Sequence, residues 1–241
     1  MCDGRQCTAY SLLSTEESFD ANFNSVLSIH NHNNEKEAYV LDQVKFKNGT
    51  VTLYSQRDVT YTYASGKVTT KDKFDINKDK GTTIAHGGVE VSAVIPYGSG
   101  RWPAIWMMPN YDETHPWPSG LEIDILEFMR EPYAVTGTIH YGREENIQEK
   151  ASWNYNNNED LGTTPAQMID DKVHKYGFEW AVSLNSVTLS WYFDGASFFE
   201  IQMDKTGSST KVVMKDPKTG KTKSLFCQPW TNRCPSNFNV S

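Results

Sequence analysis

Hydrophobic and polar residues alternate along most of the chain with the two-residue period of β-strands. The clearest run places Val89, Val91, Ala93 and Ile95 on one face of a strand. Further alternating or aromatic-rich runs cover residues 51–53, 59–63, 67–70, 101–108, 134–141, 176–182, 186–193 and 197–203. Many short strands with regular turn signals predict a single all-β domain over residues 1–241, built as a sandwich or a barrel.

Two local signals complete this prediction. Asp194-Gly195 lies between two strand patterns, and both residues tolerate the positive φ values of a tight hairpin turn. We also expect one short helix over residues 164–171. No internal repeat and no linker interrupts the pattern.

The most unusual strand reads Glu122-Ile-Asp-Ile-Leu-Glu127. Side chains two apart share a face of a strand, so Glu122 and Asp124 point one way while Ile125 points into an apolar layer. Strict alternation would bury Glu127, an improbable place for an unpaired charge. A β-bulge near Ile125–Leu126 returns Glu127 to the face of the other two acids. The sequence therefore predicts three acids on one face of a sheet.

Carboxylates crowded on one face push their pKa values apart, which an acid/base catalyst requires. Glycoside hydrolysis in particular uses one charged carboxylate and one protonated carboxylic acid. The alternative interpretation is an acidic edge strand or a calcium-binding strand with no catalytic role.

Aromatic residues lie close to these acids in the sequence. Trp102 and Trp106 are four apart on a predicted strand and so share a face, and Trp117 lies five residues before Glu122. Indole rings stack on the C–H faces of sugars, although any one Trp more often packs in a core. His140 ends the next strand and is placed to hydrogen-bond to the acids.

Charge and cysteine content limit the class of protein. The formal net charge of −7 argues against a nucleic-acid or anionic-membrane partner. No apolar run reaches the length of a membrane span, and the start of the chain has no signal-peptide pattern. Cys2, Cys7, Cys227 and Cys234 lie near the two ends, where disulfides of a secreted protein or unrelated free thiols are both consistent with the sequence.

Three motifs together resemble the laminarinase branch of glycoside hydrolase family 16. They are Trp-Pro-Ala-Ile-Trp-Met-Met-Pro at 102–109, the acidic hexad at 122–127 and Thr-Ile-His-Tyr-Gly at 138–142. Weaker similarity extends from about residue 34 to residue 203. The resemblance implies a β-jelly-roll of two curved antiparallel sheets, with a substrate cleft across the concave one.

The same resemblance assigns roles to the acids. Glu122 corresponds to the nucleophile and Glu127 to the general acid/base, while Asp124 between them supports the nucleophile. Trp102, Trp106 and His140 match cleft positions, and Trp117 and Lys67 are further substrate-binding candidates.

The chain departs from the family pattern in three places. Lys67 stands where relatives usually carry Arg, which keeps the charge but loses the two-pronged guanidinium. Leu121 stands where relatives often have Gly. The family's closing C-terminal strands are not found before Ser241, so we expect a catalytic domain without them.

The predicted function is retaining endo-hydrolysis of β-1,3-glucan or mixed-linkage β-1,3(4)-glucan, with this polysaccharide as the partner. The alternatives are a non-catalytic glucan-recognition module, a galactan hydrolase and a transglycosylase on the same fold. The chemistry requires no cofactor or metal, and the sequence neither supports nor excludes the structural calcium that some relatives hold. We further expect an extracellular monomer that binds neither nucleic acid nor membrane.

Overall fold

The computed structural model describes residues 23–28, 35–71, 86–96, 98, 100–109, 117–118, 121–128, 135–141, 149–154, 171–204, 210–215 and 221–227. The chain divides into two compact units, Met1–Ile84 and Ala85–Ser241. The single domain expected over residues 1–241 stays a prediction. The helix expected over 164–171, apart from its last residue, and the cysteines Cys2, Cys7 and Cys234 lie outside the described residues.

The first unit consists of short strands and one turn of 3-10 helix. Its elements are β1 (Asn24–Ser25), β2 (Glu37–Tyr39), η1 (Leu41–Gln43), β3 (Val44–Lys47), β4 (Thr50–Leu53), β5 (Ser55–Asp58), β6 (Thr62–Ser65) and β7 (Val68–Thr69). They form the sheets β2-β6-β5, β3-β4 and β1-β7. The β3–β4 hairpin turns at Asn48-Gly49, whose φ values of 52° and 72° suit this dipeptide.

One strand prediction in this unit is partly wrong. Residues 59–61 were expected to belong to a strand, but they form a turn between β5 and β6. The cause is local: the Asp58 side chain accepts hydrogen bonds from the backbone N–H groups of Thr60 and Tyr61 at 2.7 and 3.0 Å. An aspartate that caps its own turn in this way competes with the ladder of a strand.

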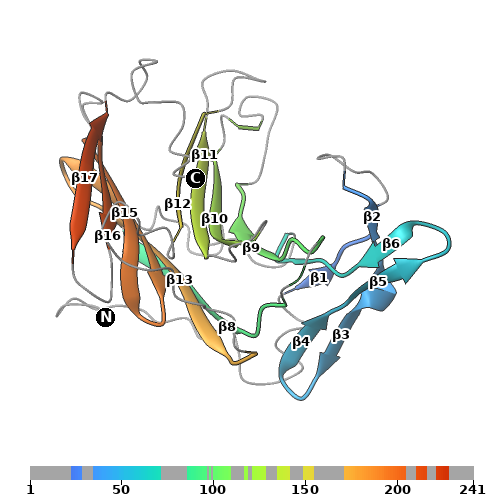
Figure 1. Ribbon diagram of the computed structural model, residues 1–241. Helices are drawn as coiled ribbons and strands as arrows, with labels where there is room; N and C mark the ends of the chain where they lie inside the picture. The colour runs from blue at the N-terminus through green and yellow to red at the C-terminus, as the bar shows by residue number, and fades with distance from the viewer. Residues whose placement is uncertain are drawn as a thin grey trace. The chain divides into compact units, whose positions relative to one another are not determined.

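The second unit contains two antiparallel sheets (Figure 1). The strands are β8 (His86–Ala93), β9 (Ala104–Met107), β10 (Glu122–Glu127), β11 (Thr136–Tyr141), β12 (Glu149–Asn154), β13 (His174–Val182), β14 (Ser186–Phe193), β15 (Ala196–Asp204), β16 (Thr210–Lys215) and β17 (Thr222–Cys227). The four-stranded sheet has the order β12-β11-β10-β9, and the six-stranded sheet has the order β17-β16-β15-β14-β13-β8. The expected all-β class is confirmed.

A single hydrophobic core joins these two sheets. The smaller sheet contributes Ile125, Leu126 and Ile139, and the larger one contributes mainly aromatic residues of β13, β14 and β15. On β8, the predicted apolar face packs against this core through Val89, Ala93 and the following Ile95. The core fixes the inner face of β10, so the opposite face of that strand is available for polar side chains.

The predicted hairpin between β14 and β15 is confirmed. Asp194 and Gly195 form its turn with φ values of 48° and 80°. Asp194 also ties this turn to β13, because its carboxylate accepts a hydrogen bond from the backbone N–H of Lys175 at 2.9 Å and contacts the His174 ring at 2.7 Å.

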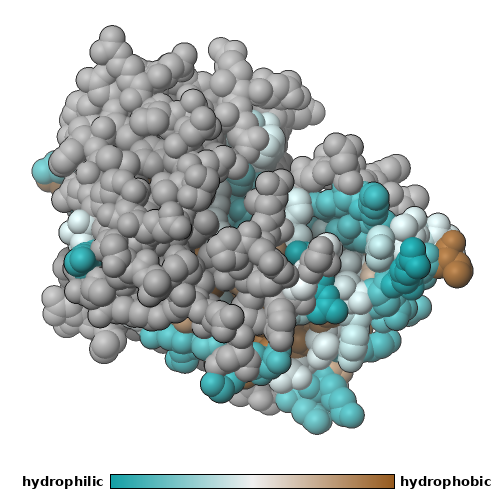
Figure 2. All heavy atoms as spheres, in the orientation of Figure 1, coloured by the Kyte–Doolittle hydropathy of each residue, from teal (hydrophilic) through white to brown (hydrophobic). Residues whose placement is uncertain are grey.

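Hydrophilic residues dominate the coloured part of the surface in Figure 2, and hydrophobic residues appear there only in small separate areas. Scattered exposed apolar side chains of this kind are normal on a water-facing surface. Among the described residues, no helix has the length and apolar character that crossing a membrane requires.

Candidate active site

The acidic strand carries the predicted bulge. On the side of β9, Asp124 pairs with Trp106 and Leu126 with Ile105, which leaves Ile125 without a partner. On the side of β11, Asp124 pairs with Thr138 and Glu127 with Thr136, so two residues oppose Gly137 alone. The extra residue reverses the alternation at this point. Ile125 and Leu126 are consequently both buried in the core, and Glu127 returns to the face of Asp124.

Glu127 is buried and is more enclosed than the other glutamate of the strand, Glu122. Its side chain accepts hydrogen bonds from Trp102 Nε1 at 3.2 Å and from Thr138 Oγ1 at 3.1 Å. Burial and the nearby charge of Asp124 raise the pKa of Glu127 to about 7, against the lowering effects of the His140 charge and the two hydrogen bonds. A carboxyl group with this pKa holds a proton in mildly acidic solution and can donate it.

Glu122 begins the same strand and is half-buried. Its Oε2 accepts a hydrogen bond from Trp117 Nε1 at 2.6 Å, so the indole fixes the orientation of the carboxylate. The register places Glu122 directly opposite His140 on β11. The Trp117 ring also lies beside the His140 ring, with centroids 6.3 Å apart. Trp117 therefore contacts two of the residues that surround the acidic face.

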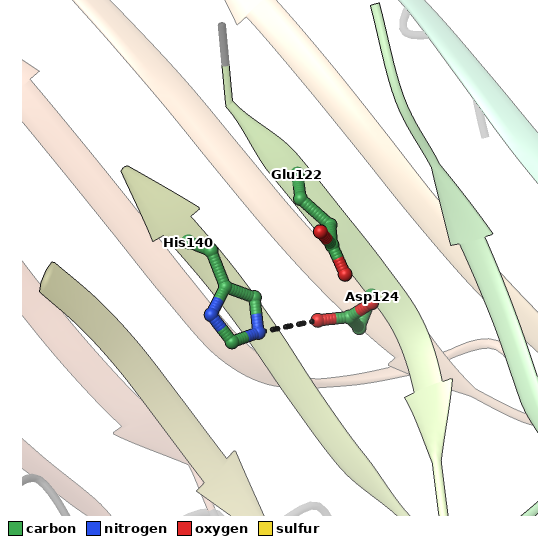
Figure 3. Close-up of side chains that lie close together, drawn as sticks. All are labelled: Glu122, Asp124 and His140. Atoms are coloured by element: carbon green, nitrogen blue, oxygen red, sulfur yellow. Dashed lines mark ion pairs between the residues drawn. The ribbon is translucent and has the colours of Figure 1, made fainter. Parts of the chain in front are cut away.

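Asp124 lies between the two glutamates in the sequence. Its side chain is buried and contacts a histidine. His140 Nε2 lies 3.1 Å from Asp124 Oδ2, as the dashed line in Figure 3 shows. Asp124 Oδ2 accepts no hydrogen bond of regular geometry from the described residues, so the contact is an ion pair when His140 is protonated. Burial lowers the pKa of His140, but contact with Asp124 and the charges of Glu122 and Glu127 raise it above its ordinary value overall. The surrounding acids therefore favour the protonated form of His140.

Glu122, Asp124 and His140 each present one ligand atom within 4.8 Å of the others (Figure 3). Oxygen and imidazole donors of this kind suit zinc and related cations. However, two of these three residues already contact each other in the Asp124–His140 pair, and a cation here would compete with that contact. The absence of a metal requirement stays a prediction.

The three tryptophans of the predicted site are all partly exposed, between 37% and 43%. Trp106 pairs with Asp124 across the β9–β10 ladder, so the two side chains share a face. The indole N–H groups of Trp102 and Trp117 each bind one of the two glutamates. The structure therefore gathers the three tryptophans, His140 and all three acids at one face of the four-stranded sheet.

Lys67 belongs to the other compact unit, where its Nζ lies 5.1 Å from the centroid of the Tyr39 ring. Its role in binding substrate stays a prediction.

Two features of the site were not anticipated. Thr138 donates a hydrogen bond to Glu127, and strand alternation puts it on the same face of β11 as His140, two residues earlier. Leu121 has a φ of 73°, in the left-handed region that favours glycine.

Comparison with known proteins identifies the family. A family model described as an XgeA-like, catalytic GH16 domain matches residues 30–207. The chain belongs to glycoside hydrolase family 16. The resemblance to the laminarinase-like branch of this family, predicted from the three motifs, is confirmed.

Two relatives are similar to this chain in sequence over part of their length. Glucan endo-1,3-beta-glucosidase A1 of Niallia circulans is 29% identical over 176 residues, which cover 71% of this chain and 23% of that protein. Glucan endo-1,3-beta-glucosidase of Cryptopygus antarcticus is 31% identical over 132 residues, which cover 49% of this chain and 44% of that protein. The chain thus spans less than half the length of these family 16 relatives.

A solved structure supports the fold. The crystal structure of endo-1,3-beta-glucanase from Streptomyces sioyaensis superposes with a TM-score of 0.56 at 21% identity, covering 76% of this chain and 69% of that one. The predicted β-jelly-roll class of family 16 is confirmed by this likeness.

The environment of Glu127 predicts a pH dependence. If the protonated carboxyl group is the active form, kcat/KM falls at alkaline pH with an apparent pKa of about 7. Thr138→Val removes a hydrogen bond that lowers the pKa of Glu127, so the alkaline limb of the pH–rate profile, where kcat/KM falls, moves to higher pH. A pH–rate profile of both proteins measures the shift, and an unchanged limb in Thr138→Val would contradict the assignment of the limb to Glu127.

The same raised pKa has a consequence for stability. Between the ordinary pKa of 4.5 and the folded value of about 7, the unfolded chain binds fewer protons at Glu127 than the folded protein does. The contribution of this group to stability therefore decreases as pH rises through this window. Thermal melts of wild type and Glu127→Gln across the window isolate the contribution, because the amide does not titrate.

Proposed function

We propose that this chain is a retaining endo-glycosidase that hydrolyses β-1,3-glucan or mixed-linkage β-1,3(4)-glucan. The observation that carries the proposal is the contrast between two carboxyl groups on one bulged strand. Glu127 is buried with a pKa of about 7, whereas Glu122 is half-buried and oriented by the Trp117 indole. Two carboxyl groups in different environments are what double-displacement hydrolysis of a glycoside requires.

In the proposed first step, Glu122 attacks the anomeric carbon while Glu127 donates its proton to the departing glycosidic oxygen. The product is a covalent glycosyl-enzyme ester on Glu122. In the second step, Glu127 accepts a proton from water, and the resulting nucleophile releases the sugar from Glu122. The residues present supply both proton transfers, so the proposed reaction needs no cofactor.

Asp124 and His140 support this cycle electrostatically. The negative charge of Asp124 helps to keep Glu127 protonated before the first step. The contact with His140 at 3.1 Å compensates part of the cost of burying Asp124 beside two glutamates. In this scheme His140 offsets the negative charge of the acids and does not itself transfer a proton.

The partly exposed tryptophans are proposed to bind the polysaccharide. Trp102, Trp106 and Trp117 share the face of the acids and can offer ring surface to the C–H groups of glucose units. The names of the two relatives, which are glucan endo-1,3-beta-glucosidases, support β-1,3-glucan as the substrate class. We also propose that the protein is secreted and monomeric.

Incubation with laminarin, lichenan and agarose tests the proposal. We expect internal cleavage of laminarin to short oligosaccharides, slower cleavage of lichenan and no cleavage of agarose. NMR of the first-formed laminarin product should show the β anomer, which defines retention. Glu122→Gln, purified in parallel, serves as the control for contaminating glucanase.

Three outcomes would overturn parts of this proposal. A first-formed α anomer would rule out retention, and faster cleavage of agarose than laminarin would move the chain to galactans. Binding to immobilised laminarin without any product would indicate a recognition module instead of an enzyme.

A further inference from the structure

One hydrogen bond connects the six-stranded sheet directly to the strand of the acids. Trp191 on β14 is fully buried, and its indole Nε1 donates to the backbone carbonyl of Asp124 at 2.8 Å. The two residues are 67 positions apart in the sequence. The bond therefore fastens the acidic strand to a different sheet, on the side away from the acids.

The position of this bond coincides with the bulge. Asp124 is the last residue of β10 in regular register before the unpaired Ile125, and the register with β11 also shifts immediately after it. A bulge disrupts the ladder of hydrogen bonds locally and leaves the strand free to change its twist. A donor from outside the sheet at this carbonyl fixes the point where the strand departs from its register.

Gly137 makes room for the indole. It is the residue of β11 that faces the two bulged residues of β10. A Cβ atom at position 137 would lie 2.5 Å from Cδ1 and 3.0 Å from Nε1 of Trp191. Any larger residue would push the indole away from Asp124, so the glycine and the tryptophan act as a pair.

The indole is itself held by neighbouring aromatic rings. The Phe178 ring meets it edge-on, with centroids 4.9 Å apart, and the Phe199 ring lies at 4.7 Å. A second irregularity occurs here, because Trp191 pairs with Phe199 while Tyr192 pairs with Ser197, so β15 carries one extra residue, Phe198, at this point. Phe198 and Phe199 are consequently both buried around the tryptophan.

We propose that Trp191 is a positioning residue that holds the β10 bulge and thereby sets where Glu127 stands relative to Glu122. Trp191 bonds to the backbone of Asp124 and is fully buried, so it does not line the substrate-facing surface. Its effect on catalysis rests on the proposed function above, whereas its effect on the bulge does not. Replacing Trp191 should slow protonation of the leaving group most, because proton donation by Glu127 depends on the bulge.

Two variants disturb the bond from opposite sides. Trp191→Phe keeps an aromatic ring in the core and removes the N–H donor, and Gly137→Ala keeps the donor but displaces it. Phe193→Leu is the matched control, since it alters a buried aromatic residue on the same strand, two positions on and on the same face. Each protein is compared at a temperature where circular dichroism shows it to be folded.

The activity measurement separates positioning from loss of stability. For Trp191→Phe and Gly137→Ala we expect kcat on laminarin to fall about 10- to 100-fold with KM within about threefold, a size typical of a misplaced catalytic group. On an aryl glucoside with a good leaving group, which departs without protonation, the decrease in kcat should stay within about threefold. Phe193→Leu should lose little on either substrate.

Hydrogen–deuterium exchange of the segment 121–128 tests the bulge without relying on activity. Trp191→Phe and Gly137→Ala should exchange faster there than wild type and Phe193→Leu. If wild type cleaved no glucan, the proposed function would fail while the exchange result still decided the role of Trp191. Exchange and activity equal to those of Phe193→Leu in both variants would overturn the proposal.

Discussion

Glu122→Gln is expected to abolish turnover on every glycoside, whatever its leaving group. An amide cannot form the ester intermediate, so neither protonation by Glu127 nor a better leaving group compensates for its loss. Removing a catalytic nucleophile lowers kcat by roughly 10⁴-fold or more. The substitution is nearly isosteric, and the amide oxygen can still accept the hydrogen bond from Trp117 Nε1 that the carboxylate accepts at 2.6 Å. The fold and the melting temperature should therefore change little.

Trp117→Phe is the matched control for this variant. It removes the hydrogen bond to Glu122 but leaves the carboxylate in place. Initial rates on laminarin should fall about 10- to 100-fold, the range typical of losing a residue that orients a catalytic group. If Glu122→Gln were folded and retained as much activity as Trp117→Phe, Glu122 would not be the nucleophile.

The bulge could be predicted from sequence because the hydrophobic pattern conflicts with strict alternation at a single point. Ile125 and Leu126 are adjacent apolar residues between two acids, and only an extra residue lets Glu127 avoid the core. The register on both sides of β10 confirms this inference. His140 was placed near the acids because it ends the next predicted strand, and in the structure it lies opposite Glu122. Period-two reasoning is reliable where one face of a strand is buried.

Contacts between sheets could not be predicted in the same way. The hydrogen bond from Trp191 to the Asp124 carbonyl joins strands far apart in sequence, and nothing local distinguishes Trp191 from the other aromatic residues of the core. The need for glycine at position 137 likewise arises only from the indole that approaches it. Such features depend on how two sheets stack, which the pattern within each strand does not encode.

Local side-chain competition explains the misplaced strand. The alternation expected of a strand is present at Val59, Tyr61 and Tyr63. However, the Asp58 carboxylate accepts hydrogen bonds from two backbone N–H groups, and residues 59–61 form a turn. Val59 is therefore fully exposed instead of facing a core. Strand propensity decides little where an aspartate can cap its own turn.

Glu127→Ala is expected to separate the two steps of the proposed reaction. Laminarin has a poor leaving group that must be protonated, so its cleavage should fall by roughly the 10²- to 10⁴-fold that general acid catalysis contributes. When the substrate is an aryl glucoside with an acidic phenol, the phenolate departs without a proton. The first step on this substrate should therefore keep much of its wild-type rate. The second step lacks its base, so a burst of phenol followed by slow turnover should appear, with the intermediate detectable by mass spectrometry.

Azide then distinguishes the role of Glu127 from that of Glu122. The small anion needs no general base, and the space left by the Glu127 side chain, which is only 9% exposed in the wild type, admits it to the intermediate. Two inversions, first by Glu122 and then by azide, give a β-glycosyl azide, and the rate should rise with azide concentration. In Glu122→Ala, azide would instead attack the substrate directly and give the α product. An α-glycosyl azide from Glu127→Ala would reverse the two roles, and equal losses on both substrates without azide rescue at either position would contradict double displacement itself.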